Sequence, residues 1–251
     1  KRAAEAKVAA EQEAVLQAWK AKAPTRRAVL SKLPPHLRLG ITLPGMFERH
    51  AALPSDAVDQ VNKVNVPKGR PPNDAVNGYV NQYFITEEAK ADNLGKCERM
   101  QKAGSPHVGE ATVFVSWFLG TSIATLLDAL GQFLNQHKLD PSTTFFWVCD
   151  YVIRQTDVGA DLKYLGDCVA AIGHTALLLE PWDKPTALGR SYCLKEIVFT
   201  QSSGAKFDVM MTSVQRASFN YALAVDQRDP ASRNRAAEEL DKTFQRDGVA
   251  L

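Results

Sequence analysis

The chain has 251 residues, of which 45% are hydrophobic and 23% are charged, and this is the composition of an ordinary globular protein. It excludes a wholly disordered chain, a collagen and a small disulfide-rich protein. The net charge is only +2, but residues 1–70 carry 13 basic and six acidic residues, while the remainder is net acidic. The basic front indicates an arm that docks on other protein subunits or on an anionic surface.

Cysteine usage and the missing motifs exclude several classes of site. The four cysteines show no CxxC spacing, so we expect no metal site and a reducing intracellular compartment. The chain begins with Lys1 instead of Met, and we therefore expect a processed chain in the cytoplasm or an organelle interior. The sequence contains no GxGxxG and no phosphate-binding loop, so it gives no support for an ordinary dinucleotide or P-loop site. It also contains no aromatic-rich basic patch, so nucleic-acid binding by the basic front is the least favoured alternative.

The first 107 residues contain no apolar pattern typical of a sheet. Residues 1–22 are rich in strong helix formers, and residues 24–72 hold more than half of the 13 prolines. Because proline removes a hydrogen-bond donor and breaks helices, we expect a helical and proline-rich extended arm over residues 1–72. Helical spacing resumes over residues 73–107, which we expect to be a helical lead-in to the following domain.

Residues 108–225 alternate short apolar runs with amphipathic helices. The runs are at 113–117, 145–149, 175–179 and 207–211, and the expected helices are at about 122–136, 162–172, 188–201 and 213–225. Continuous apolar strands indicate burial on both faces, and their alternation with helices indicates a parallel sheet. We therefore expect a flavodoxin-like α/β domain with flanking helices over 108–225, and a further helix over 226–251.

One uncharged stretch, residues 111–127, has about the minimum length for a membrane-spanning helix. Its pattern changes midway from a continuous apolar run to helical spacing. A strand followed by a helix explains this change, so we expect no integral membrane segment.

A motif lies where the third strand meets its helix, at the edge where ligands bind in such sheets. Residues 191–197, Ser-Tyr-Cys-Leu-Lys-Glu-Ile, resemble the S-W-C-L-x-E-L signature of Toll/interleukin-1-receptor-like (TIR) domains. Residues 113–116 resemble the first strand of that family, and residues 146–150 with Gln155 resemble the W-I-D…N-Q run of heterokaryon-incompatibility domains. The spacing over 172–196 is most similar to TIR-like proteins of unicellular eukaryotes. The resemblance covers about residues 108–212 and implies a TIR-like fold.

In catalytic TIR domains the signature glutamate is the key residue for cleaving the nicotinamide–ribose bond of NAD, and the resemblance assigns that role to Glu196. A carboxylate beside the anomeric carbon stabilises an oxocarbenium-like transition state and holds the ribose hydroxyls. Four aromatic residues are candidate stacking surfaces for nicotinamide or adenine: Trp117, Phe118, Trp182 and Tyr192. We do not expect Cys193 and His174 to form a nucleophile–base pair, because Cys193 lies on a predicted helix and His174 begins a predicted strand.

Several site positions depart from the family pattern. Trp117 stands where the family has histidine, Tyr192 where it has tryptophan, and Asp150 lies one residue late. We therefore expect a non-enzymatic, degenerate TIR-like scaffold. Its basic arm would dock it as a subunit into a larger assembly, for example one in a plastid or a mitochondrion. The alternative is an NAD nucleosidase that uses Glu196, with NAD as its substrate. Neither the scaffold function nor the hydrolase function requires a bound cofactor.

Overall fold

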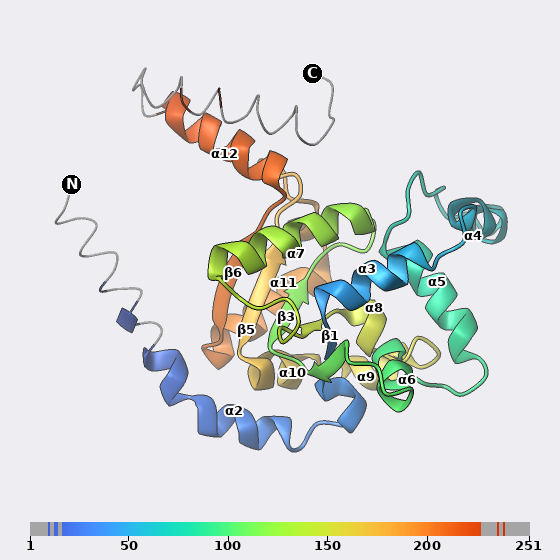
Figure 1. The fold of residues 1–251 in the computed structure, drawn as a ribbon, viewed down its shortest axis with the longest axis horizontal. Coiled ribbons are helices and arrows are strands. Elements are labelled where there is room, and N and C mark those ends of the chain that lie inside the picture. Colours follow the sequence, from blue (N-terminus) through green and yellow to red (C-terminus); the bar gives the residue numbers. More distant parts are fainter. Residues whose placement is uncertain (1–9, 11–12, 15–16, 227–234, 236–237, 239–251) are drawn as a thin grey trace.

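The computed structural model describes residues 1–251 except 1–9, 11–12, 15–16, 227–234, 236–237 and 239–251. Its centre is a six-stranded mixed sheet with the order β2-β1-β4-β3-β5-β6 (Figure 1). The strands are β1 (Leu39–Ile41), β2 (Val108–Glu110), β3 (Val113–Ser116), β4 (Phe146–Trp147), β5 (His174–Leu178) and β6 (Lys206–Met210).

Four of these strands are the ones that the apolar runs predict. β3 pairs in parallel with β4 and β5, and β5 pairs in parallel with β6. Every residue of β3 and β5 is buried, as continuous apolar strands require. The resulting order β4-β3-β5-β6 is compatible with a flavodoxin-like sheet.

Two short strands complete the sheet, and the apolar pattern did not predict them. β1 pairs antiparallel with both β2 and β4, so the sheet is mixed and the expectation of a purely parallel sheet was wrong. β1 and β2 have three residues each, which is too short for a period to show in the sequence. Their pairing depends on contacts between distant parts of the chain.

Residues 23–72 do not form the extended arm that their prolines suggested. They form α2 (Ala23–Leu30), the 3₁₀ helix η1 (Pro35–Arg38), β1, α3 (Leu43–Ala51), α4 (Ala57–Asn65) and the 3₁₀ helix η2 (Val66–Lys68). Prolines occupy the first turn of α2, η1, α3 and η2. A backbone N–H in the first turn has no acceptor within the helix, so proline breaks no hydrogen bond there. Leu37, Ile41 and Met46 are fully buried in the main hydrophobic core. This segment therefore belongs to the same folded body as the sheet.

Helices cover both faces of the sheet (Figure 1). The remaining helices are α5 (Gly78–Ala89), α6 (Lys96–Lys102), α7 (Ile123–His137), α8 (Cys149–Val152), α9 (Val158–Leu162), α10 (Leu165–Ile172), η3 (Thr186–Gly189), α11 (Ser191–Ser203) and α12 (Ser213–Asp226). α3 packs with α7 on one side, and α10 packs with α11 and α2 on the other. The four helices expected between 122 and 225 are confirmed as α7, α10, α11 and α12.

The remaining expectations concern the two ends of the chain and the membrane. Most of the helix expected over 226–251, and much of the one expected over 1–22, lies outside the described residues. Among the helices that are described, none combines the length and the apolar character needed to cross a membrane. The run at 111–127 is instead divided between β3 and α7, as its changing pattern predicts.

Candidate functional site

A cleft of about 200 Å³ lies beyond the carboxyl ends of β3 and β4. Its walls come from the residues after β3, from the segment 149–165 after β4, from the first turns of α11, and from Tyr79 and Gln82 of α5. In a sheet with this strand order, the connection after β3 runs to one face and the connection after β5 to the other, and a crevice opens between them. The cleft therefore occupies the place where open α/β sheets bind their ligands.

Glu196 of α11 is a buried carboxyl group in the wall of this cleft. Only 8% of the residue is exposed. The Ser116 hydroxyl, at the end of β3, donates a hydrogen bond of 2.5 Å to Oε2 of Glu196. No hydrogen bond joins Oε1 to another described residue. Burial raises the pKa of Glu196 to about 7, while the Ser116 hydrogen bond opposes that rise.

The position of Glu196 follows from the face of α11 on which it lies. Cys193 and Thr200 are three residues before it and four after it, so the three side chains share one helix face. The Cys193 thiol lies 3.6 Å from the carbonyl oxygen of Trp117 on the β3 side. The Thr200 hydroxyl forms a 2.8 Å hydrogen bond with that of Thr175 in β5. These contacts fix the rotation of α11, and so direct Glu196 toward the sheet.

Aromatic side chains form much of the remaining wall. Trp117, Phe118 and Tyr192, all predicted from the sequence, line the cleft together with Tyr79. The rings of Tyr79 and Phe118 pack edge to face with centroids 6.1 Å apart. The guanidinium of Arg190 lies 4.9 Å from the centroid of the Phe118 ring. The structure therefore brings Glu196 and three of the four predicted aromatic residues into one cleft.

Trp182, the fourth predicted aromatic residue, lies elsewhere. It is not among the described residues that line the cleft. Its Nε1 donates a 3.1 Å hydrogen bond to the Ser218 hydroxyl, and its ring lies 5.3 Å from that of Phe219. Trp182 thus anchors the loop after β5 to α12.

A second buried carboxyl, Asp150, also lines the cleft. The Asn81 amide donates a 2.7 Å hydrogen bond to Oδ2, while Oδ1 is buried without a hydrogen-bond partner among the described residues. Burial raises the pKa of Asp150 to about 7, and the bond from Asn81 opposes that rise. The cleft therefore holds two carboxyl groups that change charge near neutral pH.

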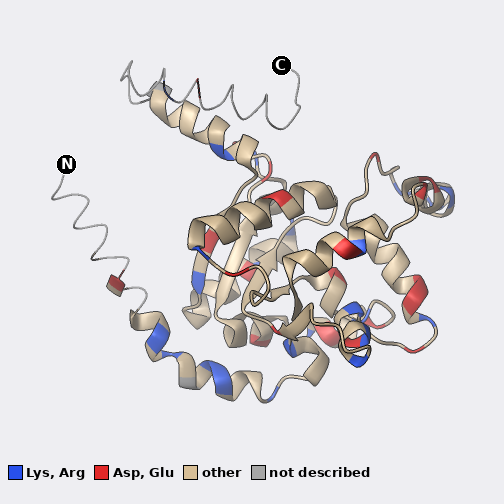
Figure 2. Cartoon of the chain, in the orientation of Figure 1, with Lys and Arg blue, Asp and Glu red and all other residues tan. Residues whose placement is uncertain are grey.

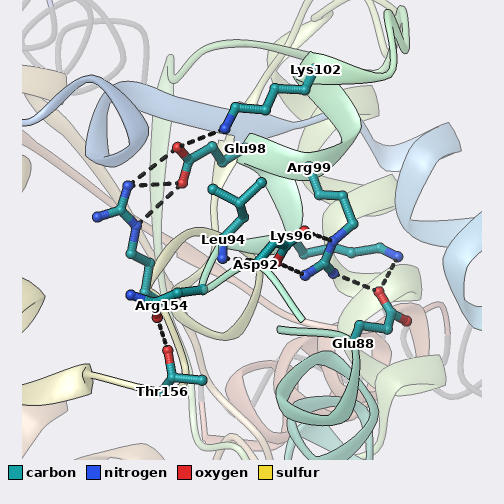
Figure 3. A network of polar contacts seen from close by, with 10 residues as sticks. Glu88, Asp92, Leu94, Lys96, Glu98, Arg99, Lys102, Arg154 and Thr156 are labelled. Atoms are coloured by element: carbon teal, nitrogen blue, oxygen red, sulfur yellow. Dashed lines mark hydrogen bonds and ion pairs between the residues drawn. The ribbon is translucent and has the colours of Figure 1, made fainter. Parts of the chain in front are cut away.

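An ion pair with α6 and hydrogen bonds to nearby residues hold the wall that follows β4. The Arg154 guanidinium donates to both carboxylate oxygens of Glu98 at 3.1 to 3.2 Å (Figure 3). The Thr156 hydroxyl donates a hydrogen bond to the side chain of Asn93. The Gln82 amide donates to the side chain of Gln155 at 2.6 Å, which ties the same segment to α5. Bidentate arginine–carboxylate pairs fix geometry as well as position. The wall is thus held from both sides.

The structure separates Cys193 from His174. His174 begins β5, at the end of the strand opposite the cleft, and its Nε2 lies 2.7 Å from the Asp208 carboxylate. Burial raises the pKa of Cys193 to about 11, so the thiolate is scarce at neutral pH. These two residues do not form a nucleophile–base pair. Within the described part of the chain, no group of three histidine, cysteine or acidic residues is placed to hold a metal ion.

Tyr79 and Gln82 are site residues that the sequence did not reveal. Both belong to α5, in the segment 73–107 that precedes the parallel strands. In the sequence Tyr79 reads as one member of an apolar helical stripe, and only the packing of α5 against the loop after β3 brings it to the cleft. The Tyr79 amide donates to the carbonyl oxygen of Leu119, which fixes this approach.

Searches with this chain matched no protein-family model, no curated protein and no solved structure. The resemblance of residues 191–197 to the TIR signature therefore stays a prediction from the sequence.

Proposed function

We propose that this chain is a TIR-like hydrolase that cleaves the N-glycosidic bond between nicotinamide and ribose in NAD. The observation that carries this proposal is the buried Glu196 carboxyl in the wall of an aromatic cleft, where Ser116 holds one oxygen and the other has no hydrogen bond from a described residue. A cleft with aromatic walls that the chain's own side chains do not fill favours an enzyme over a scaffold.

The proposed reaction needs no bound cofactor. The bond from C1′ of ribose to the nicotinamide nitrogen breaks, and its electron pair neutralises the pyridinium ring as nicotinamide leaves. The Glu196 carboxylate stabilises the positive charge that develops on C1′ and the ring oxygen. Water then adds to C1′ and releases one proton, and the products are nicotinamide and ADP-ribose.

The other cleft residues have roles that match their chemistry. Phe118 and Tyr192 offer faces on which nicotinamide stacks. Asp150 is the second carboxyl group in the cleft and the candidate acceptor for the proton that water releases, since its pKa of about 7 suits transfer at neutral pH. Low exposure of Glu196 strengthens its electrostatic effect on a bound cation.

Product analysis tests this function. The purified chain is incubated with NAD, and nicotinamide and ADP-ribose are separated by chromatography. We expect the wild type to form nicotinamide and ADP-ribose in equal amounts. We expect Glu196→Gln to release nicotinamide at least about a hundredfold more slowly, because the loss of one electrostatic catalytic group has an effect of this size. Glu180→Gln is the matched control, because Glu180 is also a partly buried glutamate with a raised pKa but does not line the cleft. Equal turnover by both variants, or no turnover by the wild type, contradicts the proposal.

A scaffold function is the second candidate, and the charge of the N-terminal helix favours it. Residues 17–33, the stretch that includes α2, contain five basic residues and no acidic one (Figure 2). The indole of Trp19 donates to the carbonyl oxygen of Gly173, which places this segment at the end of β5 opposite the cleft. Docking there leaves the cleft open, so the two functions are compatible.

Reversing the charge tests the scaffold function. Arg27→Glu changes an exposed residue of α2, and we expect it to weaken co-purification of partner subunits from cells without changing turnover of NAD. Lys63→Glu, an exposed lysine on α4, is the matched control. Equal recovery of partners by both variants contradicts docking through α2.

A further inference from the structure

A second cavity of about 490 Å³ adjoins the Glu196 cleft. Three side chains line both cavities: Tyr79, Phe118 and Arg190. The other walls of the second cavity come from the segment between α4 and α5, which includes Arg70 and Asp74. This segment lies outside the TIR-like region, so the second cavity is a feature added by the N-terminal part of the chain. We call it the Arg70 chamber.

The Glu196 cleft is too small to enclose a whole dinucleotide. Pockets for drug-sized ligands span roughly 300–1,000 Å³, and the Glu196 cleft falls below this range. It has room for a nicotinamide ring with its ribose, but the remainder of NAD must extend outside it. The Arg70 chamber is the larger neighbouring space, and Phe118 and Arg190 stand at the junction.

The charges of the Arg70 chamber match a phosphate group. Among the described residues, neither Arg70 nor Arg190 has a carboxylate within salt-bridge distance. By contrast Arg49, Arg99 and Arg154 each pair with glutamate. Asp74 also lines the chamber, so two guanidinium groups face one carboxylate. Guanidinium groups bind phosphate oxygens through paired N–H donors, and the surplus positive charge favours an anion.

The wall of the Arg70 chamber is fixed before any ligand binds. Asn62 holds Asn73 through three hydrogen bonds of 2.8 to 3.0 Å. Asn77 in turn donates to the Asn73 side chain at 2.9 Å and accepts from the amide of Val80 at 3.0 Å, at the start of α5. The amide of Arg70 donates to the carbonyl oxygen of Asn65. A wall that is already ordered loses little entropy when a ligand binds.

We propose that the Arg70 chamber is a phosphate subsite, in which Arg70 and Arg190 hold the diphosphate of the dinucleotide whose ribose lies beside Glu196. This inference rests on the proposed function and deepens it. It makes Arg70 a specificity-determining residue, because the chain then prefers phosphorylated nicotinamide nucleotides to nicotinamide riboside, which carries no phosphate.

The first arm of the test compares NAD with nicotinamide riboside. Arg70 lines only the chamber, so Arg70→Gln leaves the Glu196 cleft intact. We expect kcat/KM for NAD to fall roughly tenfold in this variant, the usual cost of losing one charge-assisted hydrogen bond, and kcat/KM for nicotinamide riboside to stay unchanged. Asp74→Asn removes the opposing charge and is the matched control, for which we expect unchanged or improved use of NAD. An equal loss for both substrates in Arg70→Gln overturns the inference.

The second arm does not depend on catalysis. Binding of inorganic pyrophosphate is measured by calorimetry with the wild type, Glu196→Gln and Arg70→Gln. We expect the first two proteins to bind equally and Arg70→Gln to bind roughly tenfold more weakly, with the difference shrinking as salt rises. Equal binding by all three proteins overturns the phosphate subsite. If pyrophosphate binding depends on Arg70 while NAD is never hydrolysed, the subsite stands and the proposed hydrolase falls.

Discussion

The Ser116 hydroxyl at the end of β3 donates a 2.5 Å hydrogen bond to the Glu196 carboxylate on α11. Both residues are buried, at 0% and 8% exposure. This bond connects the first strand of the parallel set with the helix that carries the TIR-like motif. It also opposes the effect of burial on the pKa of Glu196. The pair therefore sets the pH range in which Glu196 holds a negative charge.

Ser116→Ala should move that pH range. Without the donated hydrogen bond the ionised form of Glu196 loses a stabilising partner, and its pKa rises further above about 7. We expect the acid limb of kcat/KM for NAD to shift upward by about one pH unit, the scale of one hydrogen bond to a charged group. Ser202→Ala, an exposed serine on α11, should leave the profile unchanged. Superimposed profiles for Ser116→Ala and the wild type contradict this role.

The raised pKa of Glu196 should also appear in the stability of the fold. Its pKa is about 7 in the folded chain against an ordinary 4.5, so between these values the folded state binds more protons than the unfolded state. The free energy of unfolding therefore falls as the pH rises through this window. Glu196→Gln cannot ionise and should lose less stability between pH 5 and pH 8, by up to about 3 kcal/mol. Urea unfolding at both pH values measures this, and equal losses in both proteins contradict it.

Phe118→Ala should weaken binding of the substrate more than it slows the chemical step. Stacking of a base on an aromatic side chain is worth about 1–3 kcal/mol, so we expect KM for NAD to rise about tenfold or more. Trp182→Ala is the comparison, because Trp182 packs on Phe219 outside the cleft. It should lower the melting temperature and leave KM unchanged. A rise of KM in Trp182→Ala alone would contradict the placement of the site.

Leu37→Ala tests whether the N-terminal segment belongs to the core. Leu37 is fully buried, and its carbonyl oxygen accepts a 3.0 Å hydrogen bond from the indole of Trp147 in β4. We expect a loss of about 2–5 kcal/mol in the free energy of unfolding, as for other buried leucines. Leu188→Ala, at an exposed position, should cost less than about 0.5 kcal/mol. A similar, small loss for both would indicate that the segment detaches from the sheet.

The sequence predicted the part of the fold that local periodicity determines. β3, β4 and β5 are buried apolar runs, β6 is a partly buried edge strand, and α7, α10, α11 and α12 carry helical spacing between and after them. β1 and β2 could not be predicted, because three-residue strands have no visible period and form only through pairing with each other and with β4. The prolines of residues 24–72 led to the prediction of an extended arm, but several of them lie in the first turn of a helix, where proline is tolerated.

The site was predictable only where a motif marked it. Glu196 and Tyr192 lie in one short run, and Trp117 and Phe118 follow a predicted strand, so their places at the sheet edge follow from the topology. Trp182 also follows a strand, but its loop folds back onto α12, and nothing local in the sequence signals this. Tyr79 and Arg70 line these cavities because the segment before the parallel strands packs against distant parts of the chain. No local pattern in the sequence indicates such long-range packing.

The most direct measurement is a crystal structure of Glu196→Gln with NAD bound. The predicted result places C1′ of the nicotinamide ribose roughly 3–4 Å from the side-chain amide of residue 196, near-attack distance for a group that acts on C1′. The nicotinamide ring should lie against Phe118 or Tyr192, and the diphosphate should lie in the Arg70 chamber. A dinucleotide bound away from residue 196, or a folded variant that binds no NAD at millimolar concentration, would contradict the assignment of Glu196 to the chemistry.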